Sequence, residues 1–234
     1  MPLPKITAPT YELTLPSTGK TVKYRPFLVK EEKILMLASE SEDPKEVANA
    51  MKSVIKNCVI TRLKVEDLCS FDIEYLFLNI RGKSVGEELT INMICPDDNE
   101  TEGTVLVNVD DIKVVFPEGH TNEIELGDNL TVMMKYPNMD MFLRQNFTEE
   151  QADPYEIVSS CIDKIITDED VYEASDCSKK ELLEFIESMT SDQFMEVNKF
   201  FTTMPKLQHP VVLHNKKTGV DNELTLEGLG DFFG

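Results

Sequence analysis

The amino-acid sequence predicts an α+β fold, and two periodicities support this prediction. In several segments bulky apolar and polar residues alternate, and turn residues separate these segments in pairs, which is typical of antiparallel β-hairpins. In other segments apolar residues recur every three or four positions, which is typical of amphipathic helices. Their order predicts an N-terminal β-hairpin and helices, a central antiparallel sheet, and a helical C-terminal half closed by a short hairpin.

The N-terminal module combines the first hairpin with a charged helix. Alternation runs over residues 11–15, breaks at the turn residues 16–19, and resumes over residues 22–26. Helix-forming residues follow from Val29, and the sequence Lys-Glu-Glu-Lys begins one position later. The apolar face that we expect this helix to bury consists of Ile34, Leu37 and Ala38.

Two more helices and a second hairpin follow. A proline after Asp43 marks the start of one helix, and the other begins near Asp72. We expect all three helical faces to meet in one core. After Gly86 the period falls to two, which predicts a hairpin over residues 89–109 with its turn at residues 96–100. The expected core residues of the two helices are Val47, Met51, Val54, Ile55 and Cys58, and Ile73, Leu76, Phe77 and Ile80.

The rest of the chain continues this mixture of elements. Short strands are expected over residues 111–116, 122–126 and 129–136, and a last hairpin around residues 216–219. A boundary within residues 146–154 divides the chain into domains 1–145 and 146–234, with one continuous domain as the alternative. Three amphipathic helices are expected before the last hairpin, with faces made of Ile157, Cys161 and Ile165, of Leu182, Ile186 and Met189, and of Phe194, Val197, Phe201 and Met204.

Composition and charge exclude several classes of protein. The 234 residues are 41% hydrophobic, which is enough for a core, but no run approaches the roughly 20 apolar residues of a membrane helix. The first ten residues lack the apolar segment of a signal peptide, so we expect a soluble, intracellular protein. The net charge of -20 weighs against nucleic acid as a partner. Residues 1–60 carry a net charge of +2 and the remainder -22, so the basic side chains concentrate near the N-terminus.

No pattern of catalytic or metal-binding residues is evident. Five scattered cysteines without a C-x-x-C pair indicate buried free thiols. His209 and His214 are five residues apart across a proline, which is poor spacing for metal ligands. The acidic turns at residues 97–100 and 168–170 lack the glycine and closing glutamate of a calcium loop, and turn chemistry explains them better. We therefore predict no catalytic residue, no cofactor and no metal.

Four segments of the sequence resemble the baseplate hub proteins of T4-type contractile-tailed bacteriophages. The most specific is PTYELTLPSTGKTVKYRPFLVKEEKILMLA (Pro9–Ala38), in which a hairpin leads into a P-F-L-V-K-E-E-K signature. IKNCV (Ile55–Val59), FDIEYLFLNIRGKSVGE (Phe71–Glu87) and LEGLGDFF (Leu226–Phe233) continue the resemblance. Some members carry a C-x-x-C-like turn suggestive of a zinc knuckle between the middle strands, whereas this chain keeps only Cys95, so no zinc is carried over.

The resemblance implies a non-enzymatic protein that acts in assembly of the central baseplate hub through contacts with other hub or tail proteins. It implies a place in the host cytoplasm during assembly and in the tail baseplate of the virion, and it leaves retention in the finished virion and the oligomeric state open. The alternatives are a tail-associated hydrolase and an assembly chaperone or adaptor that is not retained. A hydrolase needs paired carboxylates, for which Glu149-Glu150 and Asp168-Glu169 are the nearest candidates.

Two groups of residues are candidates for binding a partner. Lys23, Arg25, Lys30 and Lys33 form a basic surface on the hairpin and the first helix, which we expect to dock an acidic or polar patch of another hub subunit. The middle sheet is expected to offer edges for strand addition. At the C-terminus, the spacing of Leu226, Leu229, Phe232 and Phe233 predicts a helical turn that either packs on the chain's own core or binds a partner.

Overall fold

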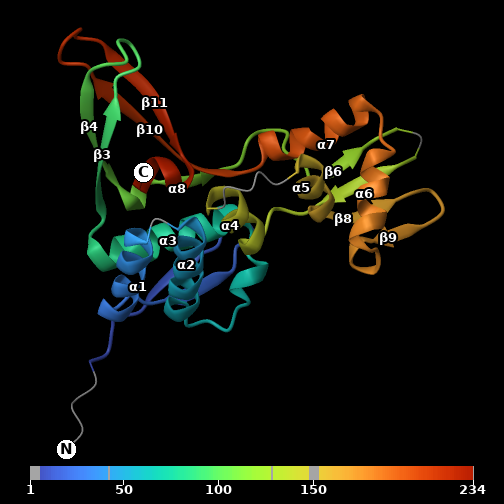
Figure 1. Cartoon of the computed structure of the whole chain (residues 1–234), viewed down its shortest axis with the longest axis horizontal. Coiled ribbons are helices and arrows are strands. Elements are labelled where there is room, and N and C mark those ends of the chain that lie inside the picture. The colour runs from blue at the N-terminus through green and yellow to red at the C-terminus, as the bar shows by residue number, and fades with distance from the viewer. Residues whose placement is uncertain (1–5, 42, 128, 148–152, 234) are drawn as a thin grey trace, which may run out of the picture. The chain divides into compact units, whose positions relative to one another are not determined.

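The computed structural model describes residues 6–41, 43–127, 129–147 and 153–233, with the backbone alone at residues 44, 48, 144–147 and 233. It confirms the α+β class: every strand pair in these ranges is antiparallel, and helices flank the sheets (Figure 1). The chain divides into two compact units. Unit 1 comprises Met1–Val115 and Lys206–Gly234, and unit 2 comprises Phe116–Pro205.

The division between the units differs from the predicted boundary near residue 146. The last hairpin belongs to unit 1 because β10 (Lys206–His214) pairs with β5 (Lys113–Val115), which places Lys206 opposite Val115. Unit 2 therefore lies in the sequence between two neighbouring strands of unit 1. Local patterns do not reveal such a pairing between distant segments.

The N-terminal module of unit 1 begins with the predicted hairpin. Strands β1 (Tyr11–Thr14) and β2 (Thr21–Tyr24) pair in antiparallel register, with Tyr11 opposite Tyr24. The Gly19 N–H donates to the Leu15 carbonyl, and the φ angle of 67° at Gly19 favours glycine in the turn. Leu15 and Tyr24 are buried, so the hairpin packs one face into the core.

Three helices follow the hairpin: α1 (Val29–Glu40), α2 (Pro44–Cys58) and α3 (Ser70–Val85). The Asp43 side chain accepts a hydrogen bond from the Lys45 N–H (2.9 Å) and caps α2, as the Asp-Pro pair predicts. All four predicted core residues of α3 are buried. In α2, Met51, Val54, Ile55 and Cys58 are buried, and Val47 is half-buried.

The prediction for the buried face of α1 was wrong for two of its three residues. Ala38 is buried, but Ile34 and Leu37 are 38% and 53% exposed. Glu31 takes an inward position instead and is fully buried. The helix turns this charged residue inward because the guanidinium of Arg25, the residue after β2, meets it there, so periodicity alone misplaced the face.

Two long hairpins complete unit 1. Strands β3 (Glu88–Ile94) and β4 (Glu102–Asn108) form the predicted second hairpin, and β10 with β11 (Asp221–Glu227) forms the last one. A methyl group added at Gly103 on β4 would lie 2.6 Å from Cδ1 of Leu213 on β10, so the two hairpins pack closely. The chain continues into α8 (Gly228–Phe233), and short 3₁₀ turns occupy Val65–Asp67 and Val109–Asp111.

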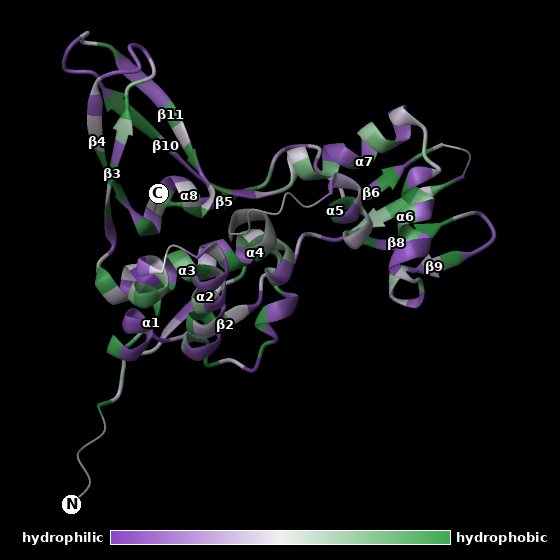
Figure 2. Cartoon of the chain, in the orientation of Figure 1, coloured by the Kyte–Doolittle hydropathy of each residue, from purple (hydrophilic) through white to green (hydrophobic). Residues whose placement is uncertain are grey.

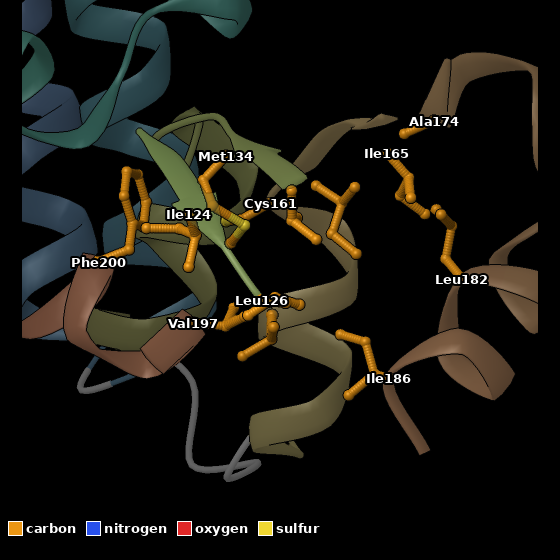
Figure 3. Close-up of a cluster of buried hydrophobic side chains, with 13 residues drawn as sticks. Ile124, Leu126, Met134, Cys161, Ile165, Ala174, Leu182, Ile186, Val197 and Phe200 are labelled. Atoms are coloured by element: carbon orange, nitrogen blue, oxygen red, sulfur yellow. The ribbon is translucent and has the colours of Figure 1, made fainter. Parts of the chain in front are cut away.

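Unit 2 is built on a four-stranded antiparallel sheet in the order β6-β7-β8-β9. Thirteen buried apolar residues, ten of them labelled in Figure 3, form its core between this sheet and the helices. Ser178 and Thr190 begin α6 and α7 as capping boxes, as predicted. The elements are β6 (Glu123–Glu125), β7 (Thr131–Met134), α4 (Met139–Phe147), α5 (Pro154–Ser160), β8 (Ile162–Ile166), β9 (Val171–Glu173), a 3₁₀ turn (Ala174–Asp176), α6 (Lys179–Glu187) and α7 (Ser191–Thr203).

One predicted helix of unit 2 is half helix and half strand. Helix α5 contains Ile157 but ends at Ser160, and Ile165 lies in β8, opposite Val132 of β7. The Cys161 carbonyl accepts a hydrogen bond from the Lys135 N–H (2.7 Å), which starts the pairing. Because the ladder with β7 satisfies the backbone here, β-branched isoleucines adopt the strand that they favour. The strands expected in one central sheet are thus distributed over three sheets.

Candidate interaction surface

A buried ion pair joins Arg25, the residue after β2, to Glu31 of α1 in the N-terminal module. The Arg25 Nη2 atom lies 2.9 Å from Oε1 of Glu31, and Arg25 Nη1 lies 3.4 Å from Oε2. The Glu31 side chain is 0% exposed and that of Arg25 is 17% exposed. Glu31 also accepts the Leu28 N–H (2.9 Å), so the carboxylate satisfies a free backbone donor at the start of α1.

Electrostatics keep this pair ionised. Burial raises the pKa of Glu31, but hydrogen bonds from Arg25, the Leu28 N–H and Lys30 outweigh it and lower the net pKa. The hydrogen bond with Glu31 raises the pKa of Arg25. Arg25 Nη1 also approaches the Cys58 Sγ at 3.7 Å, where burial raises the thiol pKa to about 11. One guanidinium, on the segment that follows β2, therefore links α1 and α2.

The structure separates the four basic candidate residues into two kinds. Arg25 belongs to the interior through its contact with Glu31. Lys23, Lys30 and Lys33 are exposed, and the ammonium groups of Lys23 and Lys30 lie 3.1 Å from Glu12 and 3.3 Å from Glu31. Of the four candidate residues, these three lysines are therefore the exposed ones, and Arg25 supports the helix that carries two of them.

An apolar groove runs between α1 and α2. One of its lining residues, Ile34, directly follows Lys33 in the sequence. The volume of the groove is about 350 Å³. Figure 2 shows apolar and hydrophilic segments side by side on α1. Ile34 and Leu37 of this helix are exposed. The lining residues are Ile34, Leu37 and Ala38 of α1 and Glu46, Asn49, Ala50 and Ser53 of α2.

The sequence did not point to this groove because its α2 wall is made of small and polar residues. Ala50 and Ser53 lack the bulk to fill the space beside α1, and neither residue type announces a binding surface in a periodic pattern. The detectable signal was on α1, where Ile34 and Leu37 form an apolar pair that the core leaves exposed.

Of the C-terminal candidate residues, Leu229, Phe232 and Phe233 lie in α8 within unit 1, whereas Leu226 lies in β11 and so outside the expected helical turn. Phe232 is 4% exposed, and Leu226 and Leu229 are also buried, so the structure shows the self-packed arrangement for these residues. The Phe233 side chain lies outside the described residues. Glu74 of α3 accepts a hydrogen bond from the Leu229 N–H, and burial raises the pKa of Glu74 to about 7.

The acidic turn at residues 97–100 joins the tips of the two long hairpins. Asp97 accepts hydrogen bonds from the Asn215 side chain (2.9 and 3.0 Å), from the Thr218 hydroxyl (2.5 Å) and from the Asn222 side chain (3.0 Å). These bonds lower the pKa of Asp97, and Asn215 first among them. The hydrogen bonds that connect this turn to the last hairpin therefore account for the Asp97 carboxylate. The sequence had already favoured a structural role in a turn over cation binding.

The candidate metal ligands are not brought together. Nδ1 of His214 lies 2.6 Å from Asp221, while Cys95 is buried beside Gly103. Among the described residues no three His, Cys, Asp or Glu side chains are placed to hold an ion. Burial raises the pKa of the Cys69 and Cys161 thiols to about 12, so these groups stay protonated and are poor nucleophiles.

The structure describes only one of the two carboxylate pairs considered for a hydrolase. Glu149-Glu150 lies outside the described residues. Asp168 is exposed and accepts a hydrogen bond from Asn129, and Glu169 is exposed beside it. His120 is held by Tyr136 (2.9 Å) and Thr203 (3.0 Å), and burial lowers its pKa.

Comparison with known families assigns the chain. The family model described as T4 bacteriophage base plate protein matches residues 8–234, which span both units. The chain belongs to this family. The assignment confirms the resemblance carried by the N-terminal signature and places the protein among T4-type baseplate proteins. No curated protein and no solved structure matches the chain. Within the described ranges, no helix of this baseplate protein has the length and apolarity to cross a membrane.

Proposed function

We propose that this baseplate protein is a non-enzymatic component of the central hub and acts in hub assembly by binding other hub or tail proteins. The observation that carries the proposal is the N-terminal module, where a buried ion pair supports a helix with exposed lysines and exposed apolar residues. In a chain of net charge -20, this basic module offers charge complementarity to acidic partners.

The site chemistry supports binding over catalysis. The described cysteines with the most strongly raised pKa are buried and protonated, and Asp97 is held by three neighbouring side chains. The protein would work in the host cytoplasm while the baseplate is built, with the tail baseplate as its place if it is retained. The transient chaperone is the alternative that the experiment below separates.

Co-purification with tagged hub proteins tests the proposal. Reversing two exposed charges, Lys23→Glu with Lys33→Glu, should strongly reduce recovery of the chain with hub assemblies. The matched control reverses Lys113 and Lys216, which are exposed lysines elsewhere in unit 1. Equal recovery of both double variants would contradict the claim that the basic surface binds hub proteins. Absence of the wild-type chain from every hub assembly contradicts the proposed function, and its presence in unfinished baseplates but not in virions identifies a transient factor.

A further inference from the structure

The groove between α1 and α2 has the form of a binding site for a helix. Three residues, 41–43, connect the two helices, so they form an αα-hairpin and run antiparallel. The lining stretch of α2 extends from Glu46 to Ser53, which is about 10 Å at 1.5 Å per residue. Small side chains at Ala38 and Ala50 form the buried floor, while Ile34 and Leu37 remain exposed at the wall.

The walls favour a helical occupant over an extended one. Both walls are helices whose backbone groups bond within their own helix, so they offer side chains and no free backbone donors or acceptors. An extended segment would leave its own N–H and C=O groups unpaired against apolar side chains, which is costly. A helix satisfies its backbone internally and brings apolar side chains at spacings of three and four residues.

The charges on α1 select which helix fits. At 3.6 residues per turn, Lys30, Lys33, Ile34, Leu37 and Glu40 fall within about one third of the helix circumference. The two lysines precede the apolar pair and the glutamate follows it. The stripe is thus basic at its N-terminal end and acidic at its C-terminal end, with Ile34 and Leu37 between. Such a stripe is complementary to a copy of itself that runs in the opposite direction.

We infer that the free protein forms a two-fold symmetric dimer in which α1 of each copy lies antiparallel in the groove of the other. Ile34 of one copy would pack against Leu37 of its partner, and Lys30 and Lys33 would face the partner's Glu40. A two-fold axis repeats every contact, so each substitution acts twice. With two large apolar side chains per copy, the dimer should be weak, in the micromolar range.

This dimer differs from the proposed hub contact and does not depend on it. Lys30 and Lys33 belong to both surfaces, so a hub partner that binds α1 would compete with the second copy. The dimer is therefore a state of the protein before it joins a baseplate. Its test needs no other protein.

Light scattering and sedimentation of the purified full-length chain over a concentration series provide the test. The wild type should approach twice its 26.6 kDa mass as concentration rises. Leu37→Asp should remain monomeric with an unchanged melting temperature because Leu37 is exposed. The matched control, Leu106→Asp, alters an apolar residue of β4 that is 72% exposed and should dimerise normally.

A charge exchange tests the antiparallel arrangement. Lys33→Glu should weaken association by about tenfold because it sets two carboxylates opposite each other on both sides of the axis. Lys33→Glu combined with Glu40→Lys should restore the wild-type affinity. A monomeric wild type, a dimer insensitive to Leu37→Asp, or a failure of the exchange to restore affinity would each overturn the inference. A monomer in which Leu37→Asp abolishes hub binding also overturns it and assigns the groove to another protein, while the proposed function stands.

Discussion

Replacing Glu31 by Gln should strongly destabilise the N-terminal module, although Glu31 lies in a charged Lys-Glu-Glu-Lys run. The substitution keeps the size of the side chain but leaves the Arg25 guanidinium, which is 17% exposed, without its carboxylate. It weakens contacts of 2.9 and 3.4 Å to Arg25 and of 2.9 Å to the Leu28 N–H. Removing one partner of a buried pair costs roughly 3–5 kcal/mol, and the residual exposure of Arg25 favours the lower end, about 3 kcal/mol.

Thermal unfolding measures this loss. For a chain of this size 1 kcal/mol corresponds to roughly 2–4 °C, so the melting temperature of unit 1 should fall by roughly 6–12 °C. Glu32→Gln alters the exposed neighbour and should leave the melting temperature within about 1–2 °C of the wild type. Replacing the pair together, Arg25→Met with Glu31→Leu, should recover much of the loss because no unpaired charge remains. A Glu31→Gln protein as stable as the Glu32→Gln control would refute the reasoning.

Three more predictions concern the rest of unit 1. Because burial raises the pKa of Glu74 to about 7, folding favours its protonated form, and the stability it contributes below pH 4.5 is lost as pH rises to 7. Glu74→Gln should therefore stabilise the protein by up to about 3 kcal/mol at pH 8 and hardly at pH 4.5, and an equal effect at both pH values argues against a buried carboxyl. Phe232→Ala should cost about 3–5 kcal/mol without changing recovery of hub complexes, whereas normal stability with failed assembly would identify an interface. Asp97→Ala should speed hydrogen exchange at residues 215–220, and unchanged exchange would show that the hairpin tips do not depend on this carboxylate.

Local periodicity correctly predicted the elements for which the local sequence pattern and the long-range packing favour the same structure. The hairpins around Gly19 and around residues 96–100 formed as expected because alternation and turn residues point to the same structure. The helix α3 did so because Ile73, Leu76, Phe77 and Ile80 all find a core to fill.

Long-range contacts account for the differences. The apolar spacing of Ile157, Cys161 and Ile165 suits a helix, but pairing with β7 makes Ile165 part of a strand. Ile34 and Leu37 were expected in the core, but Arg25 draws Glu31 inward and turns the helix. The Asp97 tether joins residues more than a hundred positions apart, and no local pattern contains it.

The candidate surface was predictable only in part. The sequence indicated a basic N-terminal surface, and three of its four named residues, Lys23, Lys30 and Lys33, are exposed. It could not assign Arg25 to the interior, since that depends on how α1 places Glu31 against the segment that follows β2. The groove was not predictable either, because it arises from how α2 lies beside α1.

Chemical cross-linking of lysines in purified hub assemblies, read by mass spectrometry, tests the central claim most directly. If the chain acts by binding hub proteins through its N-terminal module, Lys23, Lys30 or Lys33 should cross-link to another subunit at high yield. Lys113 and Lys216 serve as internal references on the same unit. Hub assemblies that contain the chain but cross-link it only through the reference lysines would contradict the account.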